Sequence, residues 1–382
     1  MRIFGLWQKL KTGTGKKELM PLQNMMITAT KPFVPDINKY NEKVKQMFDN
    51  VWFTNHGPLV LELEKKLQEY FETDYFLLVT NGTISLQLAI KALGLKGEII
   101  TTPFSYVATT ATIAYENCVP VFADIDPKTL NIDPAKIEAL ITERTSAIMV
   151  TNVFGYPSDF KAIDAIAEKH GLKVIYDSAH VFGTRQNGRS IFNHGDISSI
   201  SFHATKLFHS IEGGGLFCKD EATYQKLKLL RNFGHTSPHT FDGIGINAKM
   251  NEACAAMGLC NLDYLPEIFG SRKKQWLLYR HTITNSKFSF AEYDLEHVDY
   301  NYSYFPLIAA SEAILLKTMD ELLKHHIQTR RYFYPSLNTL NYVNHISCPV
   351  SEDISSRIFC LPLYYQLTEA EQQTICGIIN SI

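Results

Sequence analysis

The sequence lacks the cysteine spacing that a disulfide framework or a zinc ribbon needs. Its seven cysteines are odd in number and scattered, and no two of them are spaced as CxxC. It also lacks an apolar run of transmembrane length, and the apolar stretch near the N-terminus is too short for a secretory signal. These absences argue against a disulfide-stapled secreted domain and a membrane-spanning protein, and they predict a cytoplasmic protein. Residues 1–25, which carry several basic side chains, are expected to form a mobile leader.

An excess of charge of one sign is also missing. The chain has 37 Lys and Arg against 39 Asp and Glu, a formal net charge of -2. This balance gives no electrostatic reason to expect nucleic acid or an anionic membrane as a partner, so a small-molecule substrate is the default expectation. With 382 residues, of which 45% are hydrophobic, the chain is long enough for two domains.

Complete nucleotide-binding glycine motifs are absent as well. The run KTGTGKK lacks the first glycine and the hydroxyl of a Walker A loop, and GIGINA at 243–248 matches a dinucleotide motif only loosely and follows no expected βα unit. His235 and His239 are spaced like half a zinc site, but no cysteine pair accompanies them, so no metal site is predicted. The sequence therefore argues against a nicotinamide-dependent sugar oxidoreductase.

Short apolar runs that alternate with helical segments are what the sequence does contain. Helical spacing covers 37–50 and 59–71, and from residue 75 onward the runs YFLLVT, GEIITT, SAIMVTNV and LKVIYD alternate with helices. This alternation is typical of βαβ units and predicts a doubly wound α/β domain. Beyond residue 255 a helix over 255–269, aromatic-rich strands over 300–309 and a closing helix over 368–382 predict a smaller α+β domain.

Polar residues follow the predicted strands at the edge of the sheet where ligands bind in such folds. Asp177 ends a buried strand, and an ionised carboxylate there is costly unless a cation meets it; capping of the next helix is the alternative. Gly82 and Thr83 open a helix whose free N–H groups can bind an anion, although capping explains them equally well. Ser201 offers a hydroxyl to the same anion. Tyr106 offers an aromatic face, with a core tyrosine as the alternative.

Lys206 lies between a hydroxyl-rich turn and three glycines, in SFHATKLFHSIEGGG. A solvated surface side chain is the default interpretation of any single lysine. Its neighbours change that interpretation, because together they match the parts of pyridoxal phosphate. The lysine matches its aldehyde, the carboxylate its ring nitrogen, the anion cradle its phosphate and the aromatic face its ring. The sequence therefore predicts this cofactor, with Lys206 condensing with the aldehyde and Asp177 keeping the ring nitrogen protonated.

The order of these motifs resembles the DegT-type sugar nucleotide aminotransferases, which are fold-type I pyridoxal phosphate enzymes. The resemblance rests on TNGTISLQLAI, TTPFSYVATTATIAYENCVPVFADIDPKTLNID, YDSAHVFGT and SFHATKLFHSIEGGG, and it runs from about residue 26 to the C-terminus. It implies a large cofactor-binding domain over residues 26–255, built on a mostly parallel seven-stranded sheet sandwiched by helices. It further implies a small α+β domain over residues 256–382 and a homodimer whose active sites are shared across the interface.

The resemblance also assigns roles to individual residues. The catalytic group would be Lys206 as the Schiff-base lysine, Asp177 at the ring nitrogen and His180 against the phenolic oxygen of the cofactor. Asn247 would reach the phosphate in the neighbouring subunit, and Tyr106 would stack on the ring. The residues expected to bind the cofactor are Gly82, Thr83, Ile84 through its amide, Tyr106, Asp177, His180, Ser201, Lys206 and Asn247. Those expected at the substrate are Thr54, His56, Arg330 and Tyr332.

Within this family the sequence is most similar to the branch that makes dTDP-4-amino-4,6-dideoxyglucose from dTDP-4-keto-6-deoxyglucose. The resemblance implies glutamate as amino donor and a role in a surface polysaccharide such as the O-antigen of a lipopolysaccharide. Two departures stand out: Lys249 replaces the arginine of the family's Gly-Tyr-Asn-x-Arg motif and cannot reproduce its fork, and Asn152 stands where many members have histidine.

Two other functions stay open at this point. A C3 aminotransferase acting on a dTDP-3-keto-6-deoxyhexose would share every cofactor residue named above. A regulatory protein that binds pyridoxal phosphate without catalysis would keep Asp177 and the phosphate site, but it would not need Lys206 and Ser201 together. A dehydratase on the same fold would carry histidine in place of Lys206, so the lysine argues against it.

Overall fold

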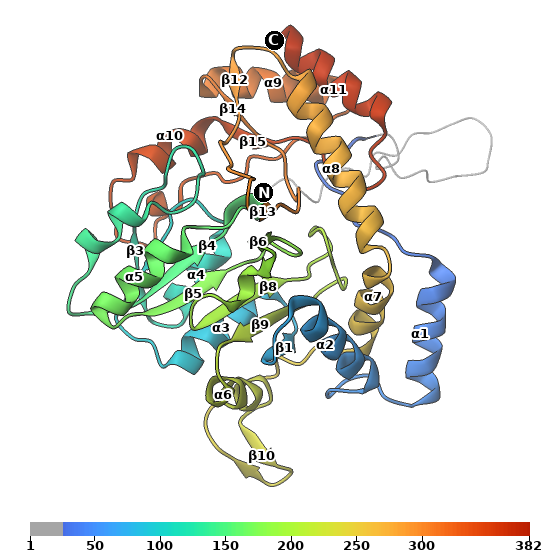
Figure 1. Ribbon diagram of the computed structural model, residues 1–382, viewed down its shortest axis with the longest axis vertical. Helices are drawn as coiled ribbons and strands as arrows, with labels where there is room; N and C mark the ends of the chain where they lie inside the picture. The colour runs from blue at the N-terminus through green and yellow to red at the C-terminus, as the bar shows by residue number, and fades with distance from the viewer. Residues whose placement is uncertain (1–25) are drawn as a thin grey trace, which may run out of the picture.

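The structure is a computed structural model that describes residues 26–382 (Figure 1), so the predicted leader, residues 1–25, lies outside the described residues. A seven-stranded sheet with the order β1-β9-β8-β5-β4-β2-β3 forms its centre. Neighbouring strands run parallel from β8 to β3, whereas β9 is antiparallel to both β8 and β1. The predicted mostly parallel seven-stranded sheet is therefore confirmed. Its strands are β1 (Phe76–Val79), β2 (Glu98–Thr101), β3 (Val119–Phe122), β4 (Thr145–Thr151), β5 (Lys173–Asp177), β8 (Ile197–Ser201) and β9 (Gly214–Cys218).

Alternate residues of β1 show how the sheet is covered on both faces. Phe76 and Leu78 join an apolar core with α2, α5 and α7, while Leu77 and Val79 join a second core with α3, α4 and α6. Successive side chains of a strand point to opposite faces, so a strand buried on both sides reads as a continuous apolar run. The helices are α1 (Ile37–Asp49), α2 (Pro58–Phe71), α3 (Gly82–Leu93), α4 (Val107–Tyr115), α5 (Phe160–His170), α6 (Glu221–Arg231) and α7 (Glu252–Leu262).

The helix predicted over 255–269 is two helices. After α7 the chain turns at Asp263 and Tyr264 and continues as α8 (Leu265–Thr282), which has Pro266 in its first turn. Proline lacks an N–H group and therefore fits the first turn of a helix, whereas inside one continuous helix it would break a hydrogen bond. Ala255, Ala256 and Leu259 of α7 share the core of α2 and α5. The domain boundary after residue 255 stays a prediction.

The C-terminal part has its own apolar core. A three-stranded sheet packs with α8, α9 and α11, the helices drawn toward the C-terminus in Figure 1. The expected strands over 300–309 are only partly correct, because a strand covers Pro306–Ala309 alone while residues 300–305 use polar side chains to bond the large sheet's loops. The elements are β12 (Phe288–Ser289), β14 (Pro306–Ala309), β15 (Ile358–Cys360), α9 (Glu312–Lys324), α10 (Pro349–Arg357) and α11 (Glu369–Ser381).

Two small sheets complete the fold. One joins β6 (Arg185–Gln186) to β7 (Arg189–Ser190) and to β13 (Val298–Asp299), and so connects the two parts of the chain. The other is a hairpin of β10 (His235–Ser237) and β11 (Thr240–Phe241), which projects from the end of the molecule opposite the C-terminus (Figure 1). Among the described residues, no helix combines the length and the apolar character needed to cross a bilayer.

The start of α2 depends on a carboxylate from another helix. Gly57, the residue before α2, offers no side-chain cap, and Glu252 of α7 accepts hydrogen bonds from the N–H groups of Leu59 (2.8 Å) and Val60 (2.9 Å) instead. A Cβ on Gly57 would lie 2.7 Å from the Glu252 carboxyl carbon, so glycine is what lets the carboxylate approach. The glutamate of the motif INAKMNE thus has a structural role: it ties α7 to α2.

We expect Glu252→Ala to lower the free energy of unfolding by about 2 to 3 kcal/mol, because two buried N–H groups lose a charged acceptor. Urea unfolding at fixed protein concentration measures the change. Glu69→Ala, which removes an exposed carboxylate from α2, the helix that Glu252 caps, is the matched control and should be nearly neutral. Equal stability of the two variants would contradict the capping role of Glu252.

Candidate functional site

A cavity of about 470 Å³ lies at the carboxyl ends of β4, β5 and β8. The helix starts that follow β1 and β2 and one segment of the C-terminal part complete its walls. This is the edge at which ligands bind in doubly wound sheets. The cavity brings together many of the residues predicted from the sequence, namely Gly82, Thr83, Ile84, Tyr106, Asp177, His180, Ser201, Lys206, Arg330 and Tyr332.

Lys206 lies in the turn that leaves β8, where its backbone N–H donates to the carbonyl of His203 (2.8 Å). Its side chain is partly exposed and lines the cavity. Burial lowers the pKa of Lys206 to about 8; the charge of Asp177 opposes this shift and that of Arg330 adds to it. An amine with this pKa is available in its neutral form near neutral pH, which a nucleophile or a general base requires.

Asp177 is the last residue of β5 and is 6% exposed. Its Oδ2 accepts from the hydroxyl of Thr109 (2.7 Å) and its Oδ1 accepts from the Ala179 N–H (3.3 Å). Burial raises the pKa of Asp177, although these two hydrogen bonds and the charge of Lys206 oppose the shift. A cationic group bound in the cavity would favour the ionised carboxylate, which is the electrostatic requirement expected for a protonated ring nitrogen.

The start of α3 meets the end of β8 closely enough to require glycine. A Cβ on Gly82 would lie 2.8 Å from the Cβ of Ser201, so only glycine leaves room for both segments. The N–H of Ile84 donates to the Asn81 side chain (2.9 Å), which caps the helix. Gly82, Thr83 and Ser201, the residues predicted to bind an anion, therefore lie together, while the Ile84 amide, predicted for the same anion, is engaged by the cap.

His180 follows Asp177 in the same loop and is buried. Its Nδ1 accepts a long hydrogen bond (3.3 Å) from the N–H of Phe154. Its ring lies parallel to that of Phe333, with centroids 5.7 Å apart. Burial, with a smaller contribution from the charge of Lys206, lowers the pKa of His180 well below its usual value, so the imidazole is neutral.

Arg330 and Tyr332 reach the cavity from the C-terminal part of the chain. The Arg330 backbone pairs with Cys360 of β15 in both directions (3.2 and 2.8 Å), which fixes its position at the sheet edge. Its guanidinium lies over the ring of Tyr332, 4.2 Å from the centroid. A cation and an aromatic ring thus face the cofactor residues across the cavity.

Three predicted residues lie away from this cavity. Thr54 is exposed, and His56, which lies 3.2 Å from the buried carboxylate of Glu64, lines another cavity of about 780 Å³ near the β10 hairpin. Asn247 is exposed and its backbone pairs with that of Asn232. Lys249, the lysine that departs from the family motif, lines the same cavity as His56 and donates to the Asn232 side chain (2.9 Å).

Several contributors were missed by the sequence analysis. Thr109 bonds the key carboxylate, and Glu212 and Phe333 line the cavity. Thr109 lies one helical turn after Tyr106, a spacing that places both at the start of α4. That spacing is the only signal for Thr109, and the sequence offers none for Phe333, which reaches the cavity through tertiary packing.

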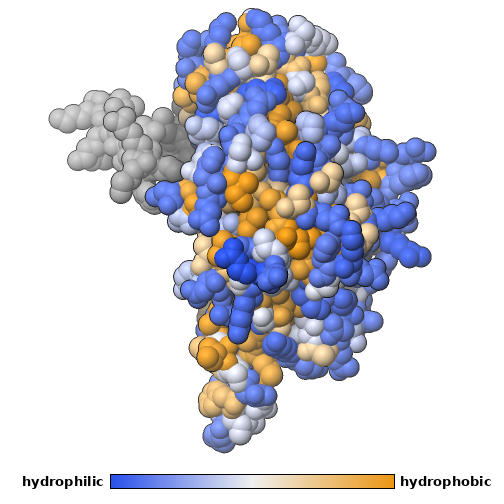
Figure 2. Space-filling model, turned by 90° about the vertical axis from the view of Figure 1, so that its left-hand side faces the viewer, coloured by the Kyte–Doolittle hydropathy of each residue, from blue (hydrophilic) through white to orange (hydrophobic). Residues whose placement is uncertain are grey.

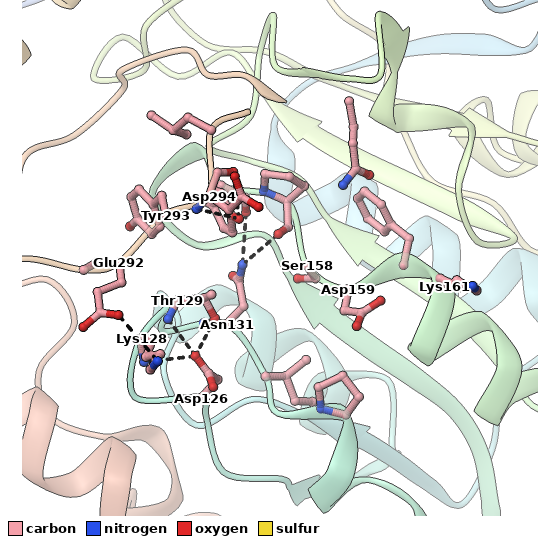
Figure 3. Close-up of a pocket in the computed structure, with 18 of the residues that line it drawn as sticks. Asp126, Lys128, Thr129, Asn131, Ser158, Asp159, Lys161, Glu292, Tyr293 and Asp294 are labelled. Carbon is pink, nitrogen blue, oxygen red and sulfur yellow. Dashed lines mark hydrogen bonds and ion pairs between the residues drawn. The ribbon is translucent and has the colours of Figure 1, made fainter. Parts of the chain in front are cut away.

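A larger cavity of about 1070 Å³ lies elsewhere, between the loops that precede α5 and the segment 291–295 (Figure 3). Several of its charged groups are already engaged. The side chain of Asp126 accepts from the N–H groups of Lys128 and Thr129, Asp159 caps α5, and Lys128 pairs with Glu292 at 3.6 Å. It contains none of the residues predicted for cofactor or substrate, so the smaller cavity is the candidate site.

Comparisons with known proteins agree with this assignment. The model of the DegT/DnrJ/EryC1/StrS aminotransferase family matches residues 36–380. The dTDP-4-amino-4,6-dideoxy-D-glucose transaminase of Shigella dysenteriae is 39% identical over 365 residues, which cover 93% of this chain and 99% of that one. The enzyme of the same name from Escherichia coli is 34% identical over 361 residues, 91% of this chain and 96% of that one.

A solved structure described as DesI in the presence of its TDP-sugar product superimposes with a TM-score of 0.89 at 30% identity, covering 94% of this chain and 93% of that one. The resemblance that the motifs indicated thus extends along nearly the whole chain, in sequence and in structure. The chain belongs to the DegT/DnrJ/EryC1/StrS aminotransferase family.

Proposed function

We propose that this chain transfers the amino group of glutamate to the C4 keto group of dTDP-4-keto-6-deoxyglucose, giving dTDP-4-amino-4,6-dideoxyglucose for a surface polysaccharide. Aminotransferases of this family depend on pyridoxal phosphate. The proposed chemistry rests on one observation: Lys206, Asp177 and the start of α3 line the same cavity. The likeness to the Shigella transaminase over nearly its full length supports the choice of sugar and of C4.

The cavity fits the cofactor in three respects. The close approach of Gly82 and Ser201 leaves the helix start open to a phosphate, held by Thr83 and the Ser201 hydroxyl. Asp177, buried at the end of β5, would hold a protonated ring nitrogen, whose positive charge favours the ionised carboxylate. Tyr106, at the start of α4, would cover the ring face. The Ile84 amide would join the phosphate site by sharing its hydrogen between Asn81 and the phosphate.

When bound, pyridoxal phosphate supplies an aldehyde that accepts an amino group and a ring that stabilises the carbanion formed as a proton leaves carbon. Lys206, neutral in an appreciable fraction at pH 7, removes the α-proton of glutamate with its Nζ and later delivers a proton to C4 of the sugar. His180, neutral because it is buried, would donate from Nε2 to the phenolic oxygen. Arg330 and Tyr332 would hold the diphosphate or the base of the nucleotide.

A homodimer with shared sites accounts for the residues that lie away from the cavity. Asn247 and His56 lie near the projecting β10 hairpin, beside a cavity that is lined by the basic side chains of Lys228 and Lys249. Figure 2 shows apolar side chains in a band on the face that carries this hairpin, and Phe241 (62% exposed) and Ile244 (93% exposed) lie in the hairpin and in the segment that follows it. A second copy that covers this face would bring Asn247 to the neighbouring phosphate site.

The deciding assay supplies the holoenzyme with glutamate and dTDP-4-keto-6-deoxyglucose and locates nitrogen on the product by NMR. We expect nitrogen at C4 and formation of 2-oxoglutarate. Lys206→Ala is the control and should lose activity by at least about 10² to 10⁴-fold, since a positioned general base contributes that much. Reaction only with the isomeric 3-keto sugar, yielding nitrogen at C3, would contradict the proposal.

The pKa of Lys206 predicts how capture of the cofactor depends on pH. Only the neutral amine attacks the aldehyde, so the rate at which cofactor-free protein binds pyridoxal phosphate covalently should rise with pH and level off above about pH 8. An ordinary lysine would continue to gain rate to above pH 10. Stopped-flow absorbance of the bound cofactor measures the profile. Lys206→Ala serves as the blank, and a plateau only above pH 10 would show that burial does not lower this pKa.

Mixing two inactive variants tests the shared site. Asn247→Ala damages the phosphate site of the neighbouring chain, and Lys206→Ala damages its own, so a mixed dimer has one intact site. After subunit exchange in equal amounts, about a quarter of all sites should be active, because half of the dimers are mixed and each restores one of two sites. Exchange demonstrated by mass spectrometry without recovered activity would mean that each site is built within one chain.

A further inference from the structure

The residues that join β13 to β14 run behind His180. We call residues 300–303 the strap. It begins next to β13, which pairs with β6 beside the large sheet, and it leads to β14 in the sheet of the C-terminal part. Tyr300, Asn301 and Ser303 are all buried. The strap forms no strand, and its polar side chains bond the loops that carry His180 and Phe154.

Two side chains of the strap hold the His180 backbone. The Asn301 amide and the Ser303 hydroxyl both donate to the His180 carbonyl, at 2.8 and 2.9 Å. Asn301 also donates to the Phe182 carbonyl (3.0 Å), and its Oδ1 accepts from the Ser303 N–H (3.1 Å). A carbonyl that accepts two buried hydrogen bonds has little freedom to turn, so the direction in which the His180 side chain leaves the backbone is set.

Tyr300 holds the partner of the His180 ring. Its hydroxyl donates to the Phe154 carbonyl (2.8 Å), and burial raises the pKa of Tyr300 well above its usual value, so the hydroxyl keeps its proton. Phe154 has a φ of 54°, a left-handed conformation that a bulky residue adopts only when its surroundings impose it. In this conformation its N–H faces the ring and donates to His180 Nδ1.

The direction of that hydrogen bond decides where the imidazole proton lies. A backbone N–H only donates, so Nδ1 of His180 must accept, and the single proton of the neutral ring is then on Nε2. Since Nδ1 is engaged by Phe154, Nε2 is the ring nitrogen left for the cavity that His180 lines. A ring that turned away from Phe154 would lose this selection between the two nitrogens.

We propose that the strap fixes His180 in the Nε2–H tautomer, with Tyr300 acting as a positioning residue through the Phe154 peptide and with Asn301 and Ser303 acting through the His180 carbonyl. The tautomer itself follows from contacts within the chain. Its use, to donate a proton from Nε2 to the phenolic oxygen of the cofactor, rests on the proposed function.

Tyr300→Phe tests the proposal with the loss of one oxygen atom. The ring keeps its packing against Tyr293 and Trp276, so the fold should persist. The measurement is ¹⁵N NMR of the full-length protein with ¹⁵N-labelled histidine, in which the His180 signals are those missing from His180→Gln. In the wild type we expect a protonated Nε2 and an unprotonated Nδ1. In Tyr300→Phe both signals should move toward each other, because the second tautomer becomes populated.

Tyr302→Phe is the matched control, since it removes a hydroxyl from the same segment and the Tyr302 ring, like that of Tyr300, packs against Trp276. It should reproduce the wild-type histidine signals. Ser303→Ala, which removes one of the two donors to the His180 carbonyl, should shift the signals in the same direction as Tyr300→Phe and carries the test if that variant does not fold. Wild-type signals in a folded Tyr300→Phe or, where that variant does not fold, in Ser303→Ala would overturn the proposal.

Kinetics adds a readout that a purely structural role would not move. In Tyr300→Phe, where the second tautomer of His180 becomes populated, kcat should fall about tenfold while KM for both substrates changes little. The reason is that a proton donor is lost in the transition state while substrate binding is kept. The NMR result stands whether or not the chain aminates the 4-keto sugar. Failure of the proposed function and failure of the strap proposal are thus distinguishable.

Discussion

The site depends on holding a carboxylate and an amine together in the wall of one cavity, where the surrounding protein disfavours the charged form of each. Burial acts on both in the direction of neutrality: it raises the pKa of Asp177 and lowers that of Lys206 to about 8. The hydrogen bonds from Thr109 and Ala179 oppose the rise in the pKa of Asp177, and the nearby charge of Arg330 adds to the lowering of the pKa of Lys206. The result is an amine that can give and take protons near neutral pH, and a carboxylate whose charge a bound cation would restore.

The fold delivers both groups from the carboxyl ends of neighbouring strands. Asp177 ends β5, a strand flanked on both sides by parallel neighbours, and Lys206 follows β8, the next strand in the sheet. Both faces of this sheet are filled by apolar side chains, so the strand ends cannot shift without disturbing the core. The C-terminal part adds Arg330, pinned to β15, and the strap behind His180. The groups proposed for catalysis lie at the strand ends of the large sheet, and the C-terminal part of the chain adds one wall of the cavity and supports the His180 loop.

Much of this arrangement could be predicted from the sequence because it follows from local patterns. Apolar runs separated by helices located the strands, and polar residues at their ends led to Asp177, Ser201 and Lys206. The hydrogen bond from Thr109 to Asp177 could not be predicted, because no sequence pattern shows which strand end a threonine on a helix faces. The strap was misread as strand, since its aromatic residues have high β-propensity while its structure is decided by hydrogen bonds to a distant loop.

The residues expected at the substrate lie in two places: Arg330 and Tyr332 line the candidate cavity, whereas Thr54 and His56 lie outside it. Every residue suited to the cofactor's ring and aldehyde lies around one cavity of a single chain. Thr54, His56 and Asn247 lie outside it, and Lys249, the departure from the family motif, is turned toward Asn232 at the second, basic cavity. If a second copy completes the site, substitutions around that basic cavity can alter which nucleotide sugar binds while the Lys206 and Asp177 chemistry stays intact.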